Sequence, residues 1–257
     1  MDINKILQLS SKAGRIILEN GGETYRVEET ICRICSAFGF KEADSFVTPT
    51  GMMSSIVDDE GKTVSLVKRI SRRTVNLEKI SRVNDLSRRI CSENLSVEFV
   101  EEELKVINKL PSYKEKITVV AAAVAAGFFT LLYGGNMLDF LIAALIGVLI
   151  RIISIKLMNL NLNIFIINIL SAATAAFVAL AFTSFIKGTH SDNIIIGSIM
   201  LLVPGLAITN AIRDTIEGDL VSGVARAMEA FFIAISVAAG TGIVLKLWIY
   251  GFGGIRI

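Results

Sequence analysis

Five long apolar runs in the second half of the chain limit its fold more than any other feature. An α-helix needs roughly 20 apolar residues to cross a bilayer, and each run approaches that length, the first only with its flanks included. The runs cover residues 117–132, 138–155, 164–186, 194–212 and 220–247. Because a helix satisfies its backbone polar groups internally, even in lipid, the sequence predicts about five transmembrane helices.

Charge divides the chain into two parts. Only 7 of its 26 Lys and Arg residues and 6 of its 24 Asp and Glu residues lie in 117–257. We therefore expect a soluble domain over 1–116 and a transmembrane domain over 117–257. The first apolar positions are interrupted by charges such as Lys5 and Lys12, so no signal peptide is expected. A net charge of +2 gives no reason to expect a nucleic-acid partner.

The soluble part is predicted to contain two helices, then β-hairpins, then two further helices. Helical periodicity is expected over 3–18 and 24–38, with Gly21-Gly22 ending the first helix and Thr24 capping the second. Three strands joined as hairpins and two further helices should follow: 43–49, 52–58, 62–69, 76–93 and 96–110. The predicted fold class is an α-helical polytopic membrane protein with an N-terminal α+β cytoplasmic domain.

Flanking cations and cysteines indicate the orientation. Lys and Arg are more frequent on the side of the spans that faces the soluble domain, which predicts a cytoplasmic N-terminus and an outside C-terminus. All three cysteines lie in the soluble part, as in a reducing compartment. Cys32 and Cys35 have the spacing of half a zinc site, but the single histidine, His190, is predicted across the membrane. Buried core thiols are therefore favoured, and no metal or cofactor is expected.

The fourth run is interrupted by Pro204-Gly205. Pro204 removes a backbone hydrogen bond and frees the carbonyl four residues earlier, and Gly205 permits close approach of another backbone. Broken helices of this kind form binding sites in transporters. Polar residues follow, the first four of them on one helix face: Asn210, Arg213, Asp214, Glu217 and Asp219. The competing interpretation is a plain helix end, with Glu217 and Asp219 in a wet cytoplasmic loop.

A few ionisable residues fall inside the predicted spans. Asp139 begins the second span, either as a solvated helix-start residue or as part of a transport path. Arg151 is expected to extend to the inner membrane surface. Arg226 and Glu229 in the fifth span could neutralise each other at the membrane boundary, or line a pathway.

Several stretches resemble one known family. GGETYRVEETICRICSAFG, followed by VTPTGM, resembles the start of the threonine/serine exporter family, in its five-span N-terminal half. The resemblance continues through RRTVNLEKISRVNDLSRRI and GGNMLDFLIAALIG, and is most specific in VPGLAITNAIRDTIEGDLVSGVARAMEA. It covers almost the whole chain.

This resemblance implies a multi-pass exporter of the bacterial inner membrane and not an enzyme. Full-length relatives continue into a second, shorter set of spans, so the chain is similar to one half of a split transporter with a smaller membrane partner. The family motif residues are Thr24, Arg26, Glu28, Thr48, Pro49, Gly51, Asp139, Pro204, Gly205, Asn210, Arg213, Asp214, Gly218, Asp219, Arg226 and Glu229.

The leading hypothesis is a proton-motive-force-driven exporter of small carboxylate-bearing metabolites, either threonine and serine or a dicarboxylate such as succinate. Arg213 or Arg226 would bind the substrate carboxylate, and Asp214 or Glu229 would carry a coupling proton. One alternative makes the soluble domain a membrane-tethered hydrolase, and another makes the chain a sensor or assembly subunit. The oligomeric state is left open. Nucleotide hydrolysis is not expected, because P-loop, GxSxG and HExxH motifs are absent from the sequence.

Overall fold

The computed structural model describes residues 2–252 of the chain. It divides into two compact units. The first comprises Met1–Ser112 together with Leu206–Met228, and the second comprises Tyr113–Gly205 together with Glu229–Ile257. The division into a cytoplasmic and a membrane domain remains a prediction, and each unit is described separately below.

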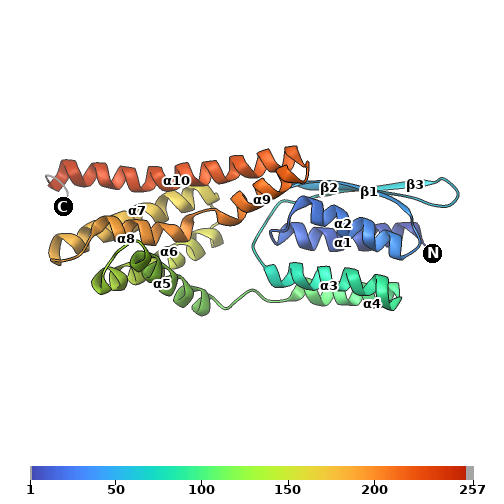
Figure 1. Cartoon of the computed structure of the whole chain (residues 1–257), viewed down its shortest axis with the longest axis horizontal. Helices are drawn as coiled ribbons and strands as arrows, with labels where there is room; N and C mark the ends of the chain where they lie inside the picture. Colours follow the sequence, from blue (N-terminus) through green and yellow to red (C-terminus); the bar gives the residue numbers. More distant parts are fainter. Residues whose placement is uncertain (1, 253–257) are drawn as a thin grey trace. The chain divides into compact units, whose positions relative to one another are not determined.

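The first unit is built around a helical pair with a sheet on one side and a second helical pair on the other (Figure 1). Its elements are α1 (Ile3–Glu19), α2 (Thr24–Ala37), β1 (Glu42–Thr48), β2 (Gly51–Val57), β3 (Thr63–Arg69), α3 (Leu77–Glu93), α4 (Val97–Lys109), nearly all of α9 (Gly205–Ile216) and the start of α10 (Leu220–Phe252). Helices α1 and α2 lie between the three-stranded sheet and the pair α3 and α4 (Figure 1). The sheet is antiparallel in the order β1-β2-β3, so the predicted hairpins are confirmed to within a residue of their predicted bounds.

Local capping explains where these helices begin. The side chains of Asp2, Asn76 and Ser96 accept hydrogen bonds from backbone N–H groups in the first turns of α1, α3 and α4. The prediction that Thr24 caps α2 is wrong. Glu23 occupies the N-cap position without a side-chain capping bond, and Thr24 is the first helical residue, which leaves its hydroxyl available for another partner.

One apolar core holds the first unit together. Its fully buried side chains come from both helix pairs and the sheet, among them Ile6, Ile17, Ile31, Ile56 and Leu104. Each such side chain stabilises the fold by about 1.5–3 kcal/mol relative to an exposed one. The cysteine prediction is confirmed for Cys35: its thiol is buried, donates to Ser10 Oγ at 3.3 Å, and has its pKa raised by that burial to about 11.

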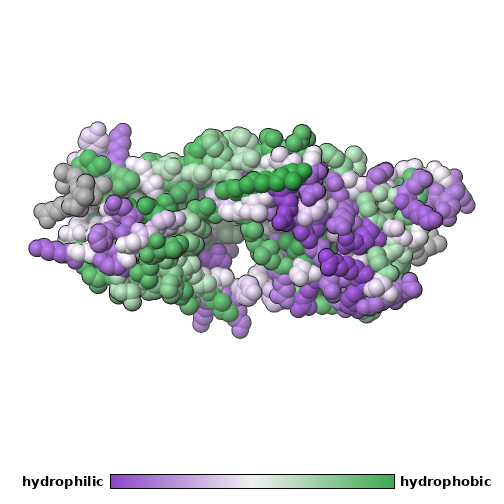
Figure 2. Space-filling model, viewed as in Figure 1, coloured by the Kyte–Doolittle hydropathy of each residue, from purple (hydrophilic) through white to green (hydrophobic). Residues whose placement is uncertain are grey.

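The second unit is a bundle of long apolar helices. Its elements are α5 (Glu115–Leu132), α6 (Met137–Asn159), α7 (Ile164–Phe185), α8 (Ser191–Ile199), the 3₁₀ turn η1 (Met200–Leu202) and the rest of α10. Among residues 2–252, four helices are long and apolar enough to cross a membrane, and a fifth span results if the bent pair Ser191–Leu202 and Gly205–Ile216 counts as one. The five predicted runs are therefore helical, and the fourth is broken at Val203-Pro204 as expected. Hydrophobic residues dominate the visible surface of this unit, whereas hydrophilic residues cover much of the first (Figure 2).

Glycines set the spacing of these apolar helices. A Cβ atom on Gly147 of α6 would lie 2.5 Å from the carbonyl oxygen of Ala122 on α5. Similarly, a Cβ on Gly240 of α10 would collide with the backbone of Ile169 on α7. Small residues permit this backbone approach, and van der Waals packing is the main attraction between helices in lipid.

Candidate functional site

The turn between α9 and α10 brings polar side chains of both helices together. Gly218 ends α9 with a φ of 95°, a conformation that glycine adopts without strain. The backbone N–H of Asp219 donates to the carbonyl oxygen of Asp214 at 2.8 Å, which closes the turn. Within about two turns of it on either helix, four polar residues are buried: Asn210, Asp214, Ser222 and Arg226. These four face the α1–α2 turn, the start of α2 and the end of β1.

A buried ion pair lies at the centre of this group. Arg226 Nε is 2.8 Å from Asp214 Oδ2, and Asp214 is 0% and Arg226 4% exposed. The contact is an ion pair without the geometry of a hydrogen bond. Arg226 also donates from Nη2 to the carbonyl oxygen of Gly22 at 2.7 Å, and Asp214 Oδ1 accepts from the backbone N–H of Thr24 at 3.2 Å. Both charges are thus bound to the α1–α2 turn as well as to each other, which offsets part of their desolvation cost.

Further polar contacts surround the pair. Asn210 Nδ2 donates to the carbonyl oxygen of Gly21 at 2.9 Å, and the Thr24 hydroxyl donates to Asp219 Oδ2 at 3.1 Å. Arg213 forms an ion pair with Glu23. We call the residues in these contacts the junction cluster: Gly21, Gly22, Glu23, Thr24, Asn210, Arg213, Asp214, Asp219 and Arg226.

Glu28 adds a further carboxylate beside Asp214 and Asp219 of the junction cluster. Its Oε1 accepts a hydrogen bond from the backbone N–H of Val47 at 2.7 Å. Burial, and secondarily the negative charges of Asp219 and Asp214, raise the pKa of Glu28 to about 7, although the bond from Val47 opposes the rise. Glu28 can therefore gain or lose a proton near neutral pH.

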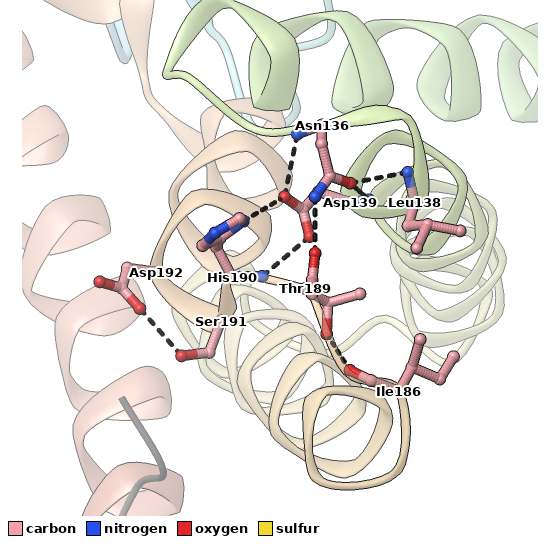
Figure 3. Close-up of polar contacts among 9 residues, drawn as sticks. Asn136, Leu138, Asp139, Ile186, Thr189, His190, Ser191 and Asp192 are labelled. Carbon is pink, nitrogen blue, oxygen red and sulfur yellow. Dashed lines mark hydrogen bonds and ion pairs between the residues drawn. The ribbon is translucent and has the colours of Figure 1, made fainter.

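A second polar site lies in the second unit, around Asp139 (Figure 3). Asn136 and Asp139 form a capping box at the start of α6. Asp139 Oδ1 accepts from the backbone N–H of His190 at 2.9 Å, and Asp139 Oδ2 lies 2.9 Å from His190 Nδ1. The interpretation of Asp139 as a solvated residue is wrong, because its side chain is 0% exposed and joins two segments far apart in sequence. Its position at a helix start is confirmed.

Arg151, on α6, is half-buried and donates from Nε to the Thr118 hydroxyl on α5 at 3.1 Å. This contact ties two neighbouring helices of the second unit. Within residues 2–252, no three His, Cys, Asp or Glu side chains gather as a metal site would require.

A family model described as "Putative threonine/serine exporter", ThrE, matches residues 8–248. The chain belongs to the threonine/serine exporter family. Over 94% of its length it is 22% identical to a probable threonine/serine exporter of Mycobacterium tuberculosis and 25% identical to a threonine/serine exporter of Corynebacterium glutamicum. It is also 21% identical, over 95% of its length, to the probable succinate transporter subunit YjjP of Escherichia coli K12.

This member of the exporter family spans different shares of those relatives. It covers 46% and 51% of the two exporters, about half of each, but 94% of the succinate transporter subunit. No solved structure matches it. The resemblance seen in the sequence motifs is thus confirmed at the level of the family, and a multi-pass membrane protein agrees with its apolar helices.

The structure brings together seven of the predicted site residues of this exporter-family chain: Thr24, Glu28, Asn210, Arg213, Asp214, Asp219 and Arg226. Of the two residues assigned to a wet loop, Glu217 is exposed as that interpretation requires. Asp219 also lies in the turn between the two helices, but it is only partly exposed and its carboxylate accepts from the Thr24 hydroxyl.

Other predicted residues lie beside this cluster or apart from it. Arg26 pairs with Glu23 at 2.8 Å and donates to the Tyr25 hydroxyl. Thr48, Pro49 and Gly51 form the β1–β2 turn, where the Thr48 hydroxyl donates to the carbonyl oxygen of Gly51 at 3.2 Å.

Pro204 lies in the break before α9, and Gly205 is the first residue of α9. Asp139 belongs to the second unit, and Glu229 lies in the part of α10 assigned to that unit. Sequence reasoning did not single out Glu23 or Ser222, although both lie inside the quoted motifs. Ser222 donates from Oγ to the carbonyl oxygen of Val47 at 3.2 Å.

Proposed function

We propose that the chain is a subunit of a secondary-active exporter of small carboxylate-bearing metabolites, driven by the proton motive force. Its substrates would be threonine and serine, or a dicarboxylate such as succinate, and it would need a smaller membrane subunit as partner. The observation that carries this proposal is the buried Asp214–Arg226 pair, in which a cation suited to bind a substrate carboxylate is held by an acid suited to bind a proton.

The pair supplies a physical route for coupling. A guanidinium group recognises carboxylates through two parallel N–H donors. Removing one partner from a buried ion pair costs about 3–5 kcal/mol, because the remaining charge is then uncompensated. If Asp214 takes up a proton, Arg226 loses its counter-ion, and a substrate carboxylate can replace it at little net cost. Proton binding and substrate binding at this site would thus favour each other.

The helix break at Pro204 also supports a transport function. Pro204 has no N–H to donate, so the helix before it ends and α9 begins anew at Gly205. Irregular backbone at membrane depth is tolerated where it is buried in protein or lines a water-filled cavity. Discontinuous helices with their exposed backbone groups are a common way in which transporters bind substrates.

The relatives support a two-subunit transporter. YjjP, which this chain nearly spans, is named as a subunit, whereas the exporters that it half spans are about twice as long. We propose that a smaller membrane protein of the same family supplies the remaining part. The proposed location is the bacterial inner membrane, with the N-terminus in the cytoplasm and the C-terminus outside.

The test is efflux of labelled threonine, serine and succinate from proteoliposomes that contain the chain and its smaller family partner. We expect efflux that requires both subunits and is accelerated by an inward proton gradient. Asp214→Asn should reduce gradient-driven efflux at least tenfold, which corresponds to about 1.4 kcal/mol. Glu217→Gln, in the turn directly after α9, is the matched control, since Glu217 is exposed.

Two outcomes would contradict the proposal. Correctly inserted subunits that move none of the three substrates would exclude it for this substrate class. Efflux that ignores the gradient, or that is equally fast in Asp214→Asn, would exclude proton coupling at this pair.

A further inference from the structure

His190 and Asp139 form a pair that the proposed transport mechanism does not yet use. His190 precedes α8, and Asp139 lies in the first turn of α6 (Figure 3). The Asn136 side chain donates from Nδ2 to the carbonyl oxygen of Gly188 at 2.6 Å, so the α7–α8 loop is bound to the α5–α6 turn as well as to the first turn of α6. The Asp139 carboxylate is wholly buried, whereas the His190 side chain is 57% exposed.

Counting donors and acceptors determines which nitrogen of His190 carries the proton. Asp139 Oδ2 accepts from the backbone N–H of Asn136 at 3.0 Å, and Oδ1 accepts from the backbone N–H of His190. Both Asp139 oxygens thus serve as acceptors, so the carboxylate offers His190 an acceptor, and Nδ1 donates to it. The neutral ring is then the Nδ1–H tautomer, and Nε2 is left as a free acceptor on an exposed ring.

Other ionisable groups lie near the His190–Asp139 pair, but the contacts described for them are with other partners. Asp192 on α8 accepts from the Ser191 hydroxyl at 2.9 Å, and Figure 3 shows its side chain on the far side of Ser191 from Asp139. Lys187 lies in the same loop as His190, and Tyr133 at the end of α5 directs its hydroxyl to the sulfur of Met200. Among the hydrogen bonds and ion pairs described, Asp139 is therefore the charged group that contacts the His190 ring directly.

We propose that His190 is a proton-binding site, with Asp139 as its buried counter-ion, on the side of the membrane predicted to be outside. This inference rests on the proposed proton-driven export, because it names the group that receives the incoming proton. Protonation at Nε2 converts the neutral imidazole into an imidazolium, and the contact with Asp139 becomes an ion pair. A stronger contact holds the α7–α8 loop more firmly to α6, directly before α8.

The first test needs no transport. His190 is the only histidine of the chain, so histidine labelled with nitrogen-15 gives the signals of one imidazole ring by NMR in nanodiscs. We expect the neutral ring to be the Nδ1–H tautomer. A predominant Nε2–H tautomer would overturn the proposal, since Nδ1 could not then donate to Asp139.

The second test is the dependence of efflux on external pH, with the internal pH held constant. The protonated fraction of an ordinary imidazole rises roughly tenfold or more between about pH 8 and about pH 6. We expect efflux of the preferred substrate to rise several-fold over that range in the native chain and to change little in His190→Gln. Asp192→Asn, an exposed neighbour on α8, is the matched control and should keep the native profile.

The outcomes separate this inference from the proposed function. A native chain whose efflux ignores the proton gradient would contradict the proposed function. Gradient-driven efflux with the same external pH profile in native chain and His190→Gln would overturn the inference alone. Asp139→Asn gives an independent check. It should flatten the external pH profile as His190→Gln does, and a native profile in this variant would also overturn the proposal.

Discussion

Asp214 Oδ2 lies 2.8 Å from Arg226 Nε, and the two side chains come from successive helices that the Gly218 turn folds back on each other. Both charges are almost completely removed from solvent. Neither residue would be stable there alone, because an isolated buried charge costs several kcal/mol. The pair therefore commits α9 and the start of α10 to one arrangement with the α1–α2 turn.

Removing the cation should destabilise the first unit. We expect Arg226→Gln to lower the free energy of unfolding by about 3–5 kcal/mol, because it leaves Asp214 buried and uncompensated. Adding Asp214→Asn to it should recover part of this loss. Thermal unfolding of the purified full-length chain in detergent would measure both effects. Strictly additive losses in the double variant would show that the two side chains are not coupled.

Glu28 should make stability depend on pH. Its pKa in the folded chain is raised to about 7 from its ordinary value of 4.5, so between these values the folded state binds more protons than the unfolded state. Stability should therefore fall as pH rises through this window and stay lower above it. Glu28→Gln keeps an acceptor for the Val47 N–H and cannot ionise.

Glu28→Gln should raise the melting temperature at about pH 8 relative to the native chain, with a much smaller difference near pH 5. Thermal melts of both proteins at the two pH values would check this. Glu29→Gln, an exposed carboxylate variant on the same helix, is the control. If the native and Glu28→Gln chains show parallel pH dependence, Glu28 does not titrate as described.

Gly22 should not tolerate a side chain. A Cβ atom there would collide with the Ile17 side chain and lie 3.0 Å from the Ile17 carbonyl oxygen. We expect Gly22→Ala to destabilise the chain by about 1–3 kcal/mol and to displace the carbonyl that Arg226 contacts. Gly242→Ala in α10, where a Cβ meets no atom within 4 Å, should be neutral or slightly stabilising. Equal melting temperatures for native and Gly22→Ala would refute the close contact.

Pro204 should matter for transport more than for folding. Pro204→Ala restores a backbone N–H and allows the helix before it to continue toward α9. We expect an efflux rate at least tenfold lower, while the amount of inserted protein stays unchanged. Pro49→Ala in the β1–β2 turn is the comparison for loss of a proline outside the apolar runs. Full efflux by the inserted Pro204→Ala protein would exclude a role for the break.

Local signals in the sequence were sufficient to predict where most helices and strands begin and end. Gly21-Gly22, the Pro-Thr-Gly turn and Asn76 end or begin helices and strands through their own backbone preferences, so the bounds agree to within a few residues. The apolar runs likewise predicted the membrane helices by length alone. The prediction for Thr24 was wrong because a hydroxyl at a helix start can either cap the helix or bind a distant side chain. The sequence does not show that Asp219 is its partner.

The junction cluster could not be derived in this way. Its contacts join residues about 190 positions apart, and no periodicity relates α2 to the α9–α10 turn. The family resemblance placed most of these residues in one motif set but gave no contact between them. Asp139 shows the same limit, since its burial depends on a loop 51 positions away.

Two contacts of the junction cluster end on peptide carbonyls. Asn210 donates to the oxygen of Gly21, and Arg226 donates to the oxygen of Gly22. A backbone carbonyl oxygen is not removed when its residue is substituted. Alanine scanning of residues 1–112 can therefore delete every side chain there that α9 and α10 contact and still leave these two acceptors intact. Replacing the peptide bond after Gly21 or after Gly22 by an ester would weaken each carbonyl acceptor separately.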